Sequence, residues 1–404
     1  MIFKVIKSTF FLFLGVLALN AQQKEINFNE FKNPAAQYRP MPLWFINGTL
    51  TDEGILKQLS DSKKAGFSGV AVLPMGITKP EYLSKDYFDR YETILSTAKK
   101  LGMHVILYDD TDFPSGSAGG LIEKEYPQYL RKSLDKTEIN ITGLYKGMVP
   151  QGKLMAAIAM DMTTKARIDL KPFIKNNILT WRAPSESDWR IMFFNNNTAS
   201  FWKPNMPVDA MDPEAMSQFM KLNYDAYAKH ISAYFTNTIK LTFFDDVGFL
   251  RKERTWTGLF NEKFKYLNGY EPDLFYPALW YDIGSETQAA RVALFNTRSE
   301  LLSEGYPKAV ADWTAKHGLK NTGHPPGNYR IQPVDMHGDI FKFFRHTALP
   351  LVDVIIDYEH GRDGYKLISS TADLYDRPVV STEVYGAFKE SIVDVNMLYR
   401  TIME

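Results

Sequence analysis

The 404-residue sequence contains no cysteine. Without disulfides the fold has to be held by a hydrophobic core, which a chain of this length can bury. A surplus of charge of either sign is also missing, because Lys plus Arg and Asp plus Glu both number 47 and the formal net charge is zero. Nucleic-acid-binding proteins usually carry a basic surplus, so the composition argues against that class of partner.

Long apolar runs are absent beyond the N-terminus. There, Lys4 and Lys7 precede an apolar run from Phe10 to Leu19, and small and polar residues follow it. The run is shorter than the about 20 residues that a bilayer-spanning helix needs. The layout is typical of a secretory signal peptide, which we predict over residues 1–21. We expect an exported protein of the bacterial periplasm or the extracellular space, with no membrane span after cleavage.

Several catalytic signatures are missing as well. No G-x-G-x-x-G follows the first predicted strand, which argues against a dinucleotide-binding fold. No G-x-S-x-G, H-x-H or H-E-x-x-H occurs, so the sequence predicts neither a serine hydrolase nor a short-motif zinc site. The segment 112–120, "DFPSGSAGG", is rich in glycine but lacks the Lys-Ser/Thr ending of a phosphate-binding loop.

Seven short runs that end in polar or acidic residues are present, over residues 41–48, 69–76, 104–110, 239–246, 319–327, 352–359 and 378–386. Runs rich in Val, Ile and Leu without strict alternation are typical of parallel strands buried on both faces. Helical patterns such as 51–67 and 84–103 lie between them. The repeat predicts an α/β fold, a (β/α)8 TIM-type barrel that lacks its last strand, and hence a truncated chain.

The gap between the third and fourth runs is longer than one helix requires, and it contains several alternating segments separated by turns. We predict a β-rich insertion after strand three, over residues 135–205. The remainder divides into the signal peptide at 1–21, a first barrel part with strands one to three at 22–134, and a second part with strands four to seven at 206–404.

Acidic residues follow most of the predicted strands. In barrels of this type, active sites lie at the C-terminal ends of the strands. Like charges that share a cleft raise one another's pKa, so a cluster of this size indicates chemistry rather than a solvated rim. The candidate site residues are Asp109, Asp110, Asp112, Asp245, Asp246, Asp357, Glu359 and Glu383, together with Trp44, Asn47 and His324.

Two interpretations of the carboxylates stay open. The first is a divalent metal site, in which Asp109, Asp110 or Asp245 would bind the ion. The second is the acid and base pair of a glycosidase, with Glu383 and one of Asp245 and Asp246 as the catalytic carboxylates. The remaining candidates would then contact substrate. Glu383 favours a functional role because it lies in an apolar strand, where an idle glutamate costs burial free energy.

Longer stretches resemble glycoside hydrolase family 106, the bacterial α-L-rhamnosidases and their relatives. They include residues 42–75, "PLWFINGTLTDEGILKQLSDSKKAGFSGVAVLPM", residues 101–120, "LGMHVILYDDTDFPSGSAGG", and residues 238–249, "TIKLTFFDDVGF". The resemblance runs from about residue 38 onward. It implies the N-terminal catalytic barrel of an exported enzyme that acts on plant polysaccharides with inversion, through two glutamates, with calcium near the site. Where that family has Asp-Glu-Pro, this sequence has Asp245-Asp246-Val247.

We therefore expect an exported α-L-rhamnosidase whose partner is an oligo- or polysaccharide and whose sequence requires no cofactor, with Ca²⁺ implied only by the resemblance. The alternatives are a barrel that binds carbohydrate without cleaving it, and a metal-dependent hydrolase or isomerase.

Overall fold

The computed structural model describes residues 28–76, 79–201, 203, 205–249, 254–355, 362–386 and 396. The described residues form two compact units, one that ends at Arg39 and one that begins at Pro40. Within the first unit, α1 spans Phe28–Lys32 and the 3-10 turn η1 spans Ala36–Tyr38. The predicted signal peptide lies outside the described residues. None of the described helices is long and apolar enough to cross a membrane.

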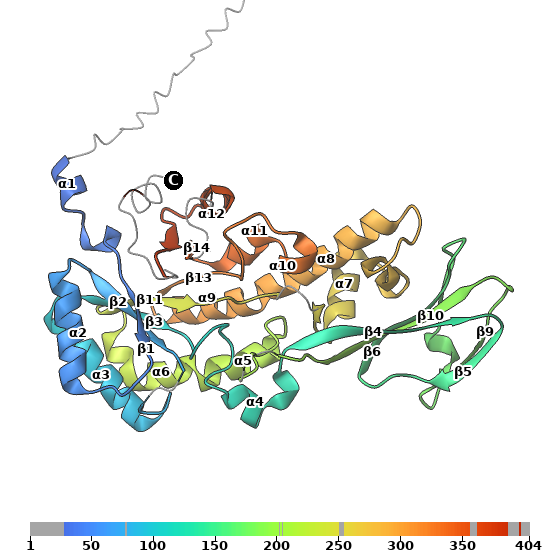
Figure 1. Cartoon of the computed structure of the whole chain (residues 1–404), viewed down its shortest axis with the longest axis horizontal. Coiled ribbons are helices and arrows are strands. Elements are labelled where there is room, and N and C mark those ends of the chain that lie inside the picture. Colours follow the sequence, from blue (N-terminus) through green and yellow to red (C-terminus); the bar gives the residue numbers. More distant parts are fainter. Residues whose placement is uncertain are drawn as a thin grey trace, which may run out of the picture. The chain divides into compact units, whose positions relative to one another are not determined.

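The second unit is built on a seven-stranded parallel sheet (Figure 1). Every neighbouring pair of strands is parallel, and the strands follow one another in chain order. They are β1 (Leu43–Ile46), β2 (Gly69–Pro74), β3 (His104–Tyr108), β11 (Ile239–Phe244), β13 (Lys320–Gly323), β14 (Leu349–Asp353) and β15 (Ser381–Glu383).

The prediction of a (β/α)8 barrel that lacks only its last strand is wrong. The sheet is open, with β1 and β15 as its edges and no strand joining them within the described residues. Buried apolar runs indicate that both faces of a sheet are covered, but they do not indicate whether its first and last strands meet. The sequence pattern was therefore the same for an open sheet and for a barrel.

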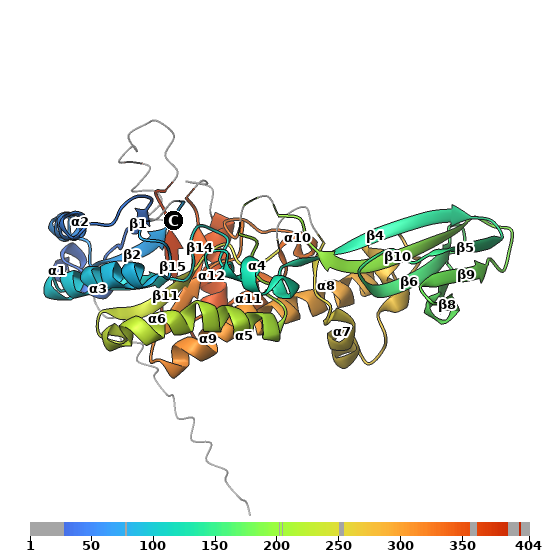
Figure 2. The ribbon, with the colours of Figure 1, turned by 90° about the horizontal axis from the view of Figure 1, so that it is seen from below.

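The helices that connect the strands begin where the sequence supplies capping residues. Thr51 and Ser84 precede α2 (Asp52–Lys64) and α3 (Lys85–Lys100), and each side chain accepts a hydrogen bond from a backbone N–H of the first turn. Asp212 does the same for α5 (Pro213–Leu222). Ile55 and Leu59 lie one turn apart on the buried face of α2. Figure 2 shows α3, α5, α6 and α9 along one side of the sheet.

The remaining helices occupy the later connections. α4 spans Leu121–Glu125 and follows β3. α6 (Tyr224–Ile231) leads into β11, and the helices between β11 and β13 are α7 (Phe260–Asn268), α8 (Thr287–Glu304) and α9 (Tyr306–Lys316). The connection to β14 holds α10 (Val334–His337) and α11 (Ile340–Phe343), and the connection to β15 holds α12 (Arg362–Leu374).

Two antiparallel sheets are formed by strands between β3 and β11, together with β12, which follows β11 in the chain. One has the order β12-β4-β10-β6-β7, and the other has the order β5-β9-β8. Their strands are β4 (Lys132–Ile141), β5 (Leu144–Met148), β6 (Lys153–Asp161), β7 (Arg167–Asp169), β8 (Ile174–Lys175), β9 (Ile178–Arg182), β10 (Trp189–Thr198) and β12 (Thr255–Trp256). A separate buried cluster joins the two sheets and includes Leu179 and Trp181 of β9 and Ile191 and Phe193 of β10.

Candidate active site

Four neighbouring strands of the parallel sheet each carry titratable side chains at their C-terminal ends. Asp245 and Asp246 follow β11, His324 follows β13, and Asp353 and Glu383 are the last residues of β14 and β15. Asp353 and Glu383 are paired in the register of their strands. In open parallel sheets, ligands bind beyond the carboxyl ends of the strands. This edge is therefore the candidate active site.

His324 lies at the centre of the cluster and is only 1% exposed. Its Nε2 atom is 3.1 Å from Asp245 Oδ1 and 3.2 Å from Glu383 Oε2. Its Nδ1 atom is 3.2 Å from the carbonyl oxygen of Pro325 and 3.7 Å from Asp246 Oδ1. Since both ring nitrogens face oxygen acceptors, the imidazole is suited to carry a proton on each.

The pKa of His324 agrees with that assignment. Burial lowers it, but the hydrogen bonds to Asp245 and Glu383 outweigh burial and hold the pKa well above its ordinary value. A buried imidazolium is thus shared by two carboxylates that come from strands on either side of β13 and β14.

The two predicted catalytic carboxylates have different surroundings. Burial, followed by the charge of Asp245, raises the pKa of Asp246 to about 7. Burial also raises the pKa of Glu383, but the hydrogen bond from His324 opposes this rise and favours the charged form. Asp246 is therefore suited to hold a proton near neutral pH, whereas Glu383 receives direct support as an anion.

Asp245 is held from several directions. The Tyr108 hydroxyl donates to Asp245 Oδ2 over 2.9 Å. The backbone of Asp245 exchanges two hydrogen bonds with Ser115, since its N–H donates to Ser115 Oγ over 2.9 Å and its carbonyl accepts from the Ser115 N–H over 2.8 Å. The neighbouring Asp246 has a φ of 50°, a left-handed conformation that non-glycine residues adopt rarely. These contacts fix the backbone on which both aspartates stand.

Asp110 is fully buried, and the glycine-rich loop surrounds its carboxylate. Its two oxygens accept hydrogen bonds from the backbone N–H groups of residues 111, 116, 117, 118 and 119 and from the Ser117 hydroxyl. Burial raises its pKa, and these backbone donors oppose the rise. Because Ser115 lies in the same loop, Asp110 connects to Asp245 through it. This placement gives Asp110 a role in holding the loop.

Replacing Asp110 by asparagine is expected to lower the free energy of unfolding by about 3–5 kcal/mol, because a neutral amide accepts weakly and presents N–H groups to N–H groups. Urea unfolding of the variant and the parent protein measures this. The matched control is Asp188→Asn at an exposed aspartate, which should change stability by less than about 0.5 kcal/mol. Equal stability of the two variants would show that the loop does not depend on Asp110.

Asp109 and Asp112 flank this carboxylate. Asp109 is fully buried, and its Oδ2 atom accepts from the hydroxyls of Tyr224 and Tyr306, each over 2.7 Å. Burial raises its pKa to about 7. Asp109 therefore ties the end of β3 to the starts of α6 and α9. The carboxylate of Asp112 accepts from the Gly76 N–H over 3.2 Å and lies nearer the surface.

The other predicted substrate contacts lie apart from this cluster or outside the described residues. Trp44 is half-buried against the main core, and Asn47 is exposed just after β1. In the sheet, β2 and β3 separate β1 from β11. Asp357 and Glu359 lie outside the described residues. The sequence placed strand six at 352–359, whereas β14 begins at Leu349 and ends at Asp353.

Sequence reasoning missed Asp353 and Lys203. Asp353 was hidden inside the predicted sixth strand, and burial raises its pKa beside His324 and Asp245. The Lys203 ammonium donates to the carbonyl of Phe113 over 2.6 Å and lies 3.4 Å from the centre of its ring. Burial lowers the pKa of Lys203, while Asp112, Asp246 and Asp245 raise it. Lys203 thus adds a positive charge near the loop that follows β3, from a segment with no recognisable motif.

Three side chains offer ligand atoms to a metal ion. One ligand atom each from Asp245, Asp246 and His324 lie within 4.8 Å of one another. Calcium prefers six to eight oxygen ligands, whereas this set includes an imidazole. That imidazole also uses its Nε2 as a donor to two carboxylates. The three residues therefore do not fit the calcium ion that the resemblance implies.

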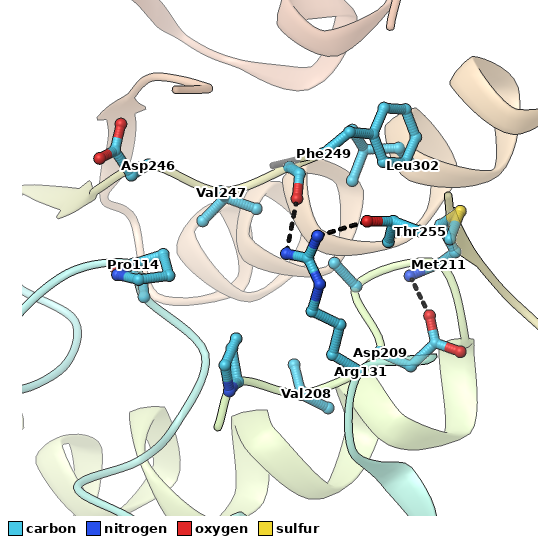
Figure 3. Close-up of a pocket in the computed structure, with 14 residues that line it drawn as sticks. Pro114, Arg131, Val208, Asp209, Met211, Asp246, Val247, Phe249, Thr255 and Leu302 are labelled. Atoms are coloured by element: carbon cyan, nitrogen blue, oxygen red, sulfur yellow. Dashed lines mark hydrogen bonds between the residues drawn. The ribbon is translucent and has the colours of Figure 1, made fainter. Parts of the chain in front are cut away.

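A small cavity borders Asp246 (Figure 3). Arg131 lies across it, and its guanidinium donates to the carbonyl of Gly248 and to the Thr255 hydroxyl. Asp209 lines the same cavity, accepts from the Met211 N–H over 3.1 Å, and has its pKa raised to about 6 by burial. Arg131 thus fastens the loop that follows Asp246.

The chain was compared with protein-family models and with solved structures, and both gave matches. The family model described as alpha-L-rhamnosidase, glycoside hydrolase family 106, matches residues 127–401. Among solved structures, a rhamnosidase from Novosphingobium sp. PP1Y is 15% identical with a TM-score of 0.66, over 88% of this chain and 52% of that chain. This chain thus spans about half the length of that rhamnosidase, and the likeness shows the fold.

A second solved structure, Cryptosporidium parvum pyruvate kinase in complex with ADP, is 9% identical over 88% of this chain and 59% of that one. Its TM-score of 0.27 is too low to indicate a shared fold. No curated protein matches the chain.

Proposed function

The chain belongs to glycoside hydrolase family 106, and from this premise we propose that it hydrolyses α-L-rhamnosides in oligo- or polysaccharides. The observation that carries the proposal is the cluster in which His324 joins Glu383 and Asp245 beside Asp246. A glycosidase needs one carboxylic acid and one carboxylate. The raised pKa of Asp246 and the hydrogen bond between His324 and Glu383 support giving them these two roles.

The proposed reaction moves two protons. Asp246 gives its proton to the glycosidic oxygen as the bond from that oxygen to the anomeric carbon breaks. Glu383 takes a proton from a water molecule whose oxygen bonds to the anomeric carbon from the opposite face. The sugar thus inverts, and each carboxyl group ends in the other's starting protonation state. His324 keeps Glu383 ionised before the reaction, because its positive charge stabilises the anion.

Replacing Asp246 by asparagine is expected to lower the rate by an amount that depends on the leaving group of the substrate. An alcohol leaving group needs a proton, so its rate should fall by about 10²–10⁴-fold. A 2,4-dinitrophenolate leaves without one, so that rate should fall far less. Measuring kcat/KM for the methyl and the 2,4-dinitrophenyl α-L-rhamnosides tests this. Equal losses for both substrates would remove Asp246 from the acid role.

A panel of 4-nitrophenyl glycosides tests the proposed activity itself. Release of nitrophenol from the α-L-rhamnoside, and not from the matched α-L-fucoside or β-D-galactoside, is the expected result. Binding of rhamnose by calorimetry without release from any glycoside would favour a carbohydrate-binding protein that does not cleave its ligand.

We also propose that the protein is exported. The support is the N-terminal arrangement of two lysines, an apolar run and small residues. Fractionation of the producing cells, with N-terminal sequencing of the mature chain, is expected to find it outside the cytoplasm and starting near residue 22. A cytoplasmic chain that keeps Met1 would contradict this.

A further inference from the structure

We propose that the outer face of the β5-β9-β8 sheet is a second carbohydrate-binding site, which takes acidic oligosaccharides that carry uronate groups. It goes beyond the proposed hydrolysis and uses none of the residues at the carboxyl ends of the parallel strands. Figure 1 shows β5 and β9 side by side among the antiparallel strands.

The site is an open groove on this sheet. Six of the residues that line it are Lys146, Phe173, Lys175, Asn176, Ile178 and Thr180. They come from three strands, from the turn before β8 and from the turn between β8 and β9, so the groove crosses the sheet rather than following one loop. A chain-like ligand could therefore lie along it.

Strand periodicity explains why these side chains face outward together. In β9, Leu179 and Trp181 are buried in the core between the two antiparallel sheets, while Ile178 and Thr180 are exposed. Side chains on one strand alternate between faces, so the exposed pair shares the outer face. The register places Thr180 opposite Lys146 on β5, and Ile178 opposite Lys175 on β8. Two cations thus flank one strand.

The groove carries the positive charges of two lysine side chains. Among the described residues, none of those that line the groove is acidic. Neither Lys146 nor Lys175 forms an ion pair within the described part of the chain. Other exposed lysines such as Lys100 and Lys316 are unpaired there too, but Lys146 and Lys175 are brought together in one groove. In a protein with a formal net charge of zero, two unpaired ammonium groups in one groove indicate an anionic ligand.

The apolar part of the groove indicates what carries that anion. Phe173 is 44% exposed, Ile178 is 36% exposed, and Met148, opposite Ile178 on β5, is 73% exposed. Exposed apolar side chains arranged together mark a binding surface. The C–H face of a sugar ring can pack on Phe173, while its hydroxyls meet Asn176 and Thr180. A uronate adds the carboxylate that the two lysines would bind.

The test measures binding of the whole protein to polygalacturonate and to neutral galactan by affinity electrophoresis and calorimetry. The parent protein is expected to bind polygalacturonate and to release it as the salt concentration is raised. Salt screens the attraction between the lysine ammonium groups and the uronate carboxylates. Replacing Lys146 and Lys175 by alanine should weaken this binding about tenfold, since exposed charge contacts each contribute modestly. Phe173→Ala should weaken it further.

The matched control is Lys100→Ala with Lys316→Ala, which removes the same charge from exposed lysines on two helices. It should leave binding unchanged, and all variants should hydrolyse a small aryl rhamnoside at the parent rate. The proposal would be overturned by no binding of polygalacturonate, by equal binding of galactan, by equal weakening in the control, or by self-association that the Lys146/Lys175 variant abolishes. Competition by an oligonucleotide at equal charge would reassign the groove to general anion binding and overturn it too.

Discussion

Replacing Glu383 by glutamine is expected to lower kcat for α-L-rhamnoside hydrolysis by about 10²–10⁴-fold, because the attacking water loses the base that takes its proton. The glutamine has nearly the same shape, so substrate binding should persist. The leaving group should not matter, since Asp246 remains to protonate it. This independence from the leaving group distinguishes the Glu383 variant from the Asp246 variant.

Initial rates on two aryl rhamnosides of different leaving-group pKa, with binding of rhamnose followed by calorimetry, measure these effects. Azide needs no base, so adding it should restore part of the turnover and give rhamnosyl azide. Glu186→Gln, at an exposed glutamate, is the matched control and should act as the parent protein does. A Glu383 variant that hydrolyses at the parental rate would remove Glu383 from the mechanism.

Replacing His324 by glutamine is expected to move the acid limb of the pH profile of kcat/KM to higher pH. Glutamine can still donate one hydrogen bond, but it carries no charge. Without the imidazolium, the pKa of Glu383 rises further, and more of the base is protonated at a given acidic pH. At a pH below that pKa, kcat/KM should fall about tenfold for each unit by which the pKa rises.

The same substitution changes how stability depends on pH. The folded-state pKa of His324 lies above the unfolded value, so its contribution to stability is present at low pH and is lost as pH rises through the folded-state pKa. The variant should lack this dependence in urea unfolding. His230→Gln is the control, because that ring is exposed and stacks on Phe88 away from the carboxylates. An unchanged acid limb in the His324 variant would show that the imidazolium does not set the pKa of Glu383.

Local patterns in the sequence predicted much of the fold, and its closure was the part that they could not specify. Apolar runs and helix-capping residues such as Thr51 and Ser84 depend only on a few neighbouring residues, so the sequence shows them directly. Six of the seven parallel strands lie within the predicted runs. Whether β1 meets the last strand depends on twist summed across the whole sheet. The sixth strand was misplaced because 354–359 is as apolar as the true strand at 349–353.

The sequence indicated which residues belong to the candidate site better than it indicated which of them touch. Asp246 and Glu383 were candidates because each is an acidic residue at the end of a predicted strand. The sequence argument for Glu383 invoked flanking apolar residues, yet Val380 is 46% exposed, and the burial of Glu383 comes with its contact to His324. That contact joins residues 59 apart in the chain, and no spacing rule predicts it. The hydrogen bonds from the loop to the Asp110 carboxylate could not be predicted from the local sequence either.

We propose that Asp246 acts as acid and Glu383 as base on opposite sides of an α-L-rhamnosidic bond. Proton NMR of the first minutes of hydrolysis of methyl α-L-rhamnoside tests it most directly, because the anomeric signal shows which product forms before mutarotation. We expect β-L-rhamnose to appear first and the Glu383→Gln variant not to form it. Initial release of α-L-rhamnose, or the same time course from the variant, would contradict these two roles.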